Sequence, residues 1–185
     1  MVRLTDGGEL LLEILSSSGA ILSSKPLKVA TGELRIPIPI YCDRETTYLA
    51  IGSDLVALSP GDNMQTIEFD SPIKSIQGSA RNTSSRIALS FDDGVQILWC
   101  DNRIVMGPKI CLDMLQPQAI FTRSGRLVVA ADDRCEVYNT VGQEAKFVGE
   151  STVEPCKRLM GCQQADLVAL LIESGKICVY RIPVS

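Results

Sequence analysis

The stretch from Arg86 to Trp99, RIALSFDDGVQILW, carries the pattern on which the fold depends. A run of small and branched apolar residues leads into the turn Asp92-Asp93-Gly94, and a second apolar run follows. Two apolar runs joined by a short polar turn predict a β-hairpin. Consecutive apolar residues without polar alternation are typical of strands that are buried on both faces.

Similar hairpin patterns recur along the chain. They are expected near residues 10–22, 48–58, 86–99, 126–138 and 166–180. The turns of the last four are spaced by about 40 residues, the period of a repeat unit with four strands. The first hairpin lies closer to the second, at about 34 residues. With no break in composition, residues 1–185 are predicted to form one all-β domain of stacked four-stranded sheets.

The repeats resemble the blades of WD40-like β-propellers. Residues 86–99 contain the second strand, the Asp-rich turn and the third strand ending in an aromatic residue, and residues 126–138 and 166–180 are similar. The resemblance implies a propeller of four to five four-stranded blades. The chain has no histidine and no Trp-Asp dipeptide, the nearest match being Trp99-Cys100-Asp101. The polar tetrad of standard blades therefore cannot form, and packing is expected to take its place.

The number of hairpins raises the question of ring closure. Five blades of about 40 residues need more chain than the 185 residues present. The first blade is therefore expected to lack its inner strand and the last blade its outer strand. Two alternatives stay open: residues Met1 to Thr5 pair with the last blade and close the ring, or the array is incomplete and another chain or segment completes it. An open strand edge invites a partner strand.

Segments between the hairpins are expected to supply the flanking strands. A strand over residues 33–41 contains Pro37 and Pro39, which confine it to an edge. Further outer strands are expected at residues 64–69 and 103–106, inner strands at 73–76, 118–122 and 157–160, and one helical turn at 110–115.

Composition and charge exclude several classes of protein. Hydrophobic residues make up 45% and charged residues 22% of the chain, which is enough to build a core. The net charge is −4, and the basic residues are scattered rather than clustered, so no nucleic-acid interface is expected. We interpret the paired basic residues as solvated loop charges; they are Arg81 and Arg86, Arg123 and Arg126, and Lys157 and Arg158.

Neither a membrane segment nor a secretory signal is expected. No apolar run approaches the roughly 20 residues of a membrane helix. Asp6 and Glu9 interrupt the region where a signal peptide would need an apolar core. The predicted location is cytoplasmic or nuclear.

The seven cysteines fit reduced thiols in such a compartment. They lie at positions 42, 100, 111, 135, 156, 162 and 178, and none forms a Cys-x-x-Cys pair. An odd number cannot be fully paired within one chain. Several fall inside predicted strands, where a free thiol acts as a small hydrophobic side chain.

No motif for catalysis, cofactor or metal binding stands out. The carboxylates at Asp92-Asp93 and Asp132-Asp133 are candidate Ca²⁺ ligands, but Asp in such turns commonly accepts hydrogen bonds from the backbone. The Gly-x-Ser-x-Gly elbow and the phosphate-binding loop are both missing. Trp99, Tyr138 and Tyr180 follow their turns at similar distances and are expected to pack between blades.

These features predict a non-catalytic scaffold for protein–protein interactions in a multi-subunit intracellular complex. The partners expected are other proteins, or a second copy bound through an open strand edge, and no cofactor, metal, nucleic acid or membrane. Two alternatives come from other classes: a propeller hydrolase that uses a pair of carboxylates, and a sensor that binds a small ligand or calcium.

Overall fold

The structure is a computed structural model that describes residues 2–5, 9–27, 38–43, 45–60, 63–79, 85–101, 103–140, 144–162 and 165–183. Within these ranges the chain forms eighteen strands and no helix. The strands make five sheets in which every pairing is antiparallel. The all-β class expected from the sequence is confirmed.

We number the five sheets in chain order. In each sheet the strands lie side by side in the order of the sequence. The first sheet contains β1 (Val2–Leu4), β2 (Leu10–Leu15) and β3 (Ile21–Leu27); the second β4 (Ile40–Cys42), β5 (Thr47–Ile51), β6 (Asp54–Ser59) and β7 (Asn63–Glu68); the third β8 (Ser75–Gly78), β9 (Arg86–Ser90), β10 (Gly94–Cys100) and β11 (Ile104–Cys111); the fourth β12 (Gln118–Phe121), β13 (Arg126–Ala131), β14 (Arg134–Asn139) and β15 (Lys146–Thr152); the fifth β16 (Cys156–Cys162), β17 (Leu167–Ile172) and β18 (Ile177–Arg181).

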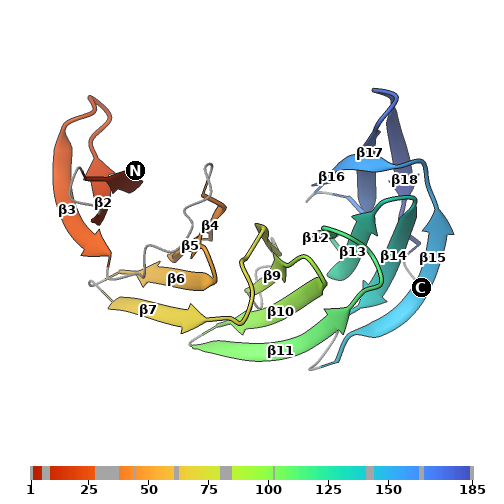
Figure 1. Ribbon diagram of the computed structural model, residues 1–185, viewed down its shortest axis with the longest axis horizontal. Helices are drawn as coiled ribbons and strands as arrows, with labels where there is room; N and C mark the ends of the chain where they lie inside the picture. Colours follow the sequence, from red (N-terminus) through yellow and green to blue (C-terminus); the bar gives the residue numbers. More distant parts are fainter. Residues whose placement is uncertain are drawn as a thin grey trace.

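The sheets lie along an open arc, with the first and the fifth at its two ends (Figure 1). Strands β7, β11 and β15 run along the convex side of the arc, and β12 lies on the concave side. In this arrangement the third and fourth sheets each turn one face toward the preceding sheet and the other toward the next. An antiparallel sheet with two apolar faces needs both of them covered, and stacking supplies the cover.

The hydrophobic core lies between consecutive sheets. Leu127 and Val129 of β13 belong to the cluster shared with the third sheet, whereas Val128 and Ala130 belong to the cluster shared with the fifth. All four side chains are fully buried. Because side chains alternate between the two faces of a strand, a strand covered on both sides must be apolar throughout. This explains the uninterrupted apolar runs in the sequence.

Several expected element boundaries were wrong. Strand β11 does not end before Pro108 but continues to Cys111, because a register shift opposite residues 96–98 accommodates the proline. The helical turn expected at 110–115 is absent, since Cys111 still pairs with Gly94 and the chain then bends without forming a helix. Residues 33–37, including Pro37, lie outside the described residues, and β4 begins only at Ile40.

The structure also corrects two expectations about ring closure. Strand β1 pairs with β2, with Val2 opposite Leu12, so the first sheet does have its inner strand. The same pairing overturns the alternative in which residues 1–5 join the last sheet. In the fifth sheet β18 is the last strand within the described part of the chain, which agrees with the expected lack of an outer strand.

Two glycines allow neighbouring sheets to approach closely. A methyl group added at Gly78 of β8 would overlap the Tyr41 ring of the second sheet, and one added at Gly161 of β16 would press on Ile120 of the fourth. In both cases a large side chain from one inner strand lies over a glycine in the inner strand of the next sheet. These positions therefore fix the spacing between the sheets.

We predict that Gly78→Ala lowers the free energy of unfolding by about 1–3 kcal/mol, because the core must shift to relieve the overlap with Tyr41. Gly149→Ala is the matched control, since nothing lies within 4 Å of its added methyl group, and its effect should stay within about 0.5 kcal/mol. Urea unfolding measures both variants. Equal effects at the two glycines would contradict the close approach.

Candidate protein-interaction surfaces

Two buried arginines link consecutive sheets at the end where the second strand of each sheet begins. Arg86, the first residue of β9, donates from Nη1 to the carbonyl oxygen of Thr140 at 2.6 Å and to its Oγ1 at 2.7 Å. The Thr140 hydroxyl donates in turn to the carbonyl of Gly125 at 2.7 Å. Arg126, the first residue of β13, donates to the carbonyl of Pro183. Each arginine thus reaches the chain just after the third strand of the following sheet.

These links overturn the interpretation of Arg86 and Arg126 as solvated loop charges. Each residue is only 7% exposed, whereas Arg123 and Arg158 are exposed as expected and Arg81 lies outside the described residues. The signal available in the sequence was the spacing of the two arginines, which equals the repeat period of about 40 residues. The expectation that packing alone replaces the polar tetrad was therefore incomplete.

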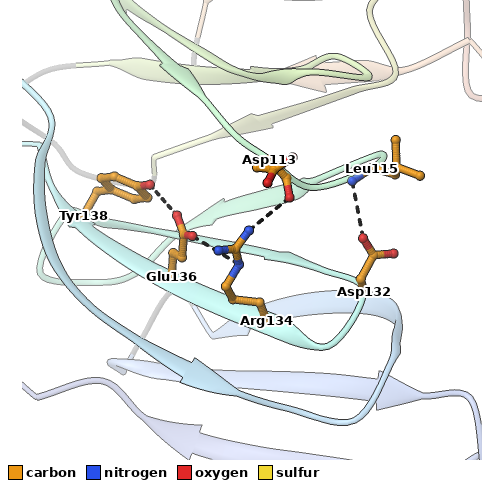
Figure 2. A network of polar contacts seen from close by, with 6 residues as sticks. All are labelled: Asp113, Leu115, Asp132, Arg134, Glu136 and Tyr138. Atoms are coloured by element: carbon orange, nitrogen blue, oxygen red, sulfur yellow. Dashed lines mark hydrogen bonds and ion pairs between the residues drawn. The ribbon is translucent and has the colours of Figure 1, made fainter.

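The opposite end of the sheets carries a second polar network (Figure 2). Arg134 of β14 donates from Nη2 to the carbonyl of Asp113 at 3.0 Å and pairs with Glu136 at 3.4 Å. Tyr138 donates its hydroxyl to the same Glu136 carboxylate. Asp132 accepts a hydrogen bond from the backbone N–H of Leu115 at 3.4 Å. The network fixes the loop between β11 and β12 against the fourth sheet.

Burial and the neighbouring Glu136 carboxylate raise the pKa of Tyr138. The tyrosine therefore stays protonated and keeps donating to Glu136 over the whole physiological pH range. Leu115, in the loop that this network holds, is 75% exposed. The arrangement presents an apolar side chain on a fixed loop.

Of the paired turn carboxylates, Asp92 and Asp93 are engaged in ion pairs. The Oδ2 atom of Asp92 lies 2.7 Å from Nζ of Lys74, and the Oδ2 atom of Asp93 lies 3.0 Å from Nζ of Lys109. The hydrogen bond from Lys109 lowers the pKa of Asp93. Among the described residues, no group of three or more His, Cys, Asp and Glu side chains is placed to hold a metal ion. The described residues also contain no helix that is long and apolar enough to cross a membrane.

The three aromatic residues expected to pack between blades behave differently. Trp99 and Tyr138 contribute to one core cluster, from the third and the fourth sheet respectively. Trp99 and Tyr138 do not occupy equivalent positions in their sheets, because Trp99 pairs with the first residue of β9 and Tyr138 with the second residue of β13. Tyr180 is the structural equivalent of Tyr138, yet it is 37% exposed. The expectation was therefore wrong for Tyr180.

The outward face of the fifth sheet is apolar and exposed. Ile177 and Val179 of β18 are 61% and 64% exposed, and Met160 of β16 is 37% exposed. Across the fifth sheet, Met160 and Val179 flank Ala169 of β17. We call the residues Met160, Leu167, Ala169, Leu171, Ile177 and Val179 the terminal face.

The matching positions of the fourth sheet are covered. Ile120 and Val137 flank Val128 in the corresponding row, and all three belong to the cluster that the fifth sheet covers. Ile120 is 6% exposed and Val128 is fully buried. The terminal face therefore occupies the positions that one more sheet would bury. Sequence reasoning predicted an open edge there but did not single out these side chains.

No family model matches the sequence, and no curated protein matches it. Solved structures do match. The β-propeller domain of Cps50 (Swd1) from Myceliophteria thermophila superposes with a TM-score of 0.69 at 11% identity, over 98% of this chain and 61% of that one. Kluyveromyces lactis Hsv2 superposes with a TM-score of 0.66 at 12% identity, over 97% of this chain and 57% of that one. Virginiamycin B lyase from Staphylococcus aureus superposes with a TM-score of 0.58 at 10% identity, over 100% of this chain and 70% of that one.

These likenesses show that the fold is that of a divergent WD40-like β-propeller. The chain spans 57 to 70% of the length of these three neighbours. The five sheets thus form an incomplete array when compared with these chains. The neighbours include an enzyme, virginiamycin B lyase, so the fold alone does not assign a function.

We predict that Arg86→Met lowers the free energy of unfolding by about 1.5–3 kcal/mol, the usual contribution of a hydrogen bond to a charged group. The exposed Arg158→Met is the control and should change it by less than about 0.5 kcal/mol. Chemical denaturation measures both variants. Indistinguishable unfolding curves would show that the arginine links contribute nothing to stability.

Thiol reactivity provides an independent test of the core. Burial raises the pKa of Cys100 to about 12 and that of Cys135 to about 11, so neither forms an appreciable amount of the reactive thiolate at pH 8. Cys42, Cys111 and Cys162 are exposed. With iodoacetamide at pH 8, mass spectrometry should find these three alkylated first. Equally fast labelling of Cys100 would contradict its place in the core.

Proposed function

We propose that the chain is a non-catalytic scaffold for protein–protein interactions in a larger intracellular complex, and that a partner protein completes its propeller array. The observation that supports this most directly is the terminal face, because its side chains are exposed where the equivalent residues of the fourth sheet are buried. Contiguous exposed apolar surface is typical of a protein interface.

The position of Arg158 supports the same role. In the fourth sheet the equivalent residue, Gln118, binds the backbone of β16, donating to Lys157 O at 2.9 Å and accepting from Leu159 N at 2.8 Å. Arg158 stands opposite Leu171 just as Gln118 stands opposite Ala130. Its guanidinium is placed to donate to backbone carbonyls of a covering sheet, and it offers the partner positive charge beside an apolar surface.

A carboxylate hydrolase remains the alternative from the enzyme class, since the likeness to virginiamycin B lyase shows that an enzyme can have this fold. Such chemistry needs a carboxylate free to act on a substrate. Glu136, buried in the fourth sheet, is already engaged by Tyr138 and Arg134. The Glu136 carboxylate therefore serves the structural network described above.

The proposed function predicts a partner that depends on the terminal face. The tagged chain should be purified from its native cells beside the double variant Ile177→Glu/Val179→Glu and the control Val148→Glu, which changes an exposed apolar residue of β15 (48% exposed). Quantitative mass spectrometry should find a partner whose recovery falls about tenfold or more in the double variant only, since two buried charges disrupt an apolar interface. Equal recovery of all partners by the three proteins would contradict the proposal.

A further inference from the structure

The outer edge of β18 is the part of the fifth sheet that differs most from the complete sheets. In the second, third and fourth sheets, the third strand pairs with an antiparallel fourth strand, as β14 does with β15. Strand β18 occupies the third position, and the described residues place nothing beside it. Its backbone is therefore available where the third strands β6, β10 and β14 are paired.

The register shows which backbone groups face this edge. Ile172 N donates to Lys176 O at 3.0 Å, and Ile182 N donates to Asp166 O at 2.8 Å. Between these two hydrogen-bonded pairs, successive residues of β18 point their backbone N–H and C=O groups alternately toward β17 and away from it. The N–H and C=O groups of Cys178 and Tyr180 therefore point toward β17, and those of Ile177, Val179 and Arg181 point outward. Three residues offer six backbone groups to an added strand.

Features that protect the outer edges of the third and fourth sheets are missing from β18. Native proteins commonly protect edge strands with bulges, prolines or charges. Strands β11 and β15 both carry register shifts, and β11 also contains Pro108. Strand β18 pairs with β17 without a shift and contains no proline, and its one charge, Arg181, stands at its end. Such an edge is suited to accept another strand.

The fourth sheet shows which side chains an added strand needs. Phe147 of β15 lies opposite Tyr138 and packs edge-on against it, with ring centroids 5.8 Å apart. Tyr180, the equivalent of Tyr138, has no such ring beside it among the described residues and is 37% exposed. Lys146 of β15 lies opposite Asn139, whose equivalent in β18 is Arg181. An added strand therefore needs an aromatic residue opposite Tyr180 and an acidic one opposite Arg181, because like charges on directly opposed residues are unfavourable.

We propose that β18 is a docking edge for an extended segment of a partner protein, which adds as an antiparallel fourth strand with an aromatic side chain against Tyr180 and an acidic one beside Arg181. The inference rests on the proposed scaffold function and specifies how the partner attaches. Backbone hydrogen bonds to Ile177, Val179 and Arg181 supply the affinity, and the two side-chain positions supply the selectivity.

A peptide derived from β15 tests this. The probe is a fluorescent peptide with the sequence of residues 144–153 in which Lys146 is replaced by Glu, so that Phe147 falls opposite Tyr180 of the intact chain. Fluorescence anisotropy should show saturable binding. Affinity should fall about tenfold, the equivalent of one lost hydrogen bond in the ladder, with Val179→Pro, which removes an outward N–H. Val179→Thr keeps that N–H and a branched side chain, and it should bind like the unchanged chain.

Two modified peptides keep the test decisive if Val179→Pro does not fold. N-methylation of the amides that face β18 should abolish binding, and restoring Lys146 should weaken it at low salt. No binding at millimolar peptide, or equal binding of the N-methylated peptide, would overturn the inference. So would dimers of the chain, seen by light scattering, that Val179→Pro dissociates, because the occupant would then be a second copy. If the peptide fails while partner recovery still depends on Ile177 and Val179, only the strand inference fails and the scaffold function stands.

Discussion

The burial of apolar side chains between consecutive sheets is the constraint on which the rest of the structure depends. A strand such as β13 sends Leu127 and Val129 into one interface and Val128 and Ala130 into the next, so the fourth sheet buries apolar side chains against both of its neighbours. The close approach at Gly78 and Gly161 sets the distance over which this burial operates. The same requirement leaves the terminal face unsatisfied within the described residues, because no sheet among them covers its apolar side chains.

Polar contacts hold the stack in register at both ends of the sheets. Arg86 and Arg126 connect the third and fourth sheets to the chain that follows the third strand of the next sheet, and the network around Arg134 fixes a connecting loop at the other end. Buried guanidinium groups hydrogen-bonded to backbone carbonyls are costly to leave unpaired. They therefore favour one alignment of the sheets over others that would bury similar apolar area.

Much of the fold could be predicted from the sequence, because apolar runs around polar turns depend only on local pattern. The apolar run of β13 and the turn at Asp132 are examples, and the period of about 40 residues indicated the repeat. What depends on tertiary context was not predictable. The bulge that lets β11 pass through Pro108 and the burial of Arg86 both require a neighbouring strand or sheet. The pairing of β1 with β2 was missed because a three-residue strand carries almost no pattern. The exposure of Tyr180 followed from the missing fourth strand, and not from its spacing.

Hydrogen exchange of the isolated chain tests most directly the claim that the array is open at β18. The amides of Ile177, Val179 and Arg181 face the open edge and should exchange rapidly, while those of Cys178 and Tyr180, bonded to β17, should be protected. In β14, which is paired on both sides, the amides of Cys135, Val137 and Asn139 should be protected as well. Protection of Val179 equal to that of Val137 would show that the edge is already covered and would contradict the account.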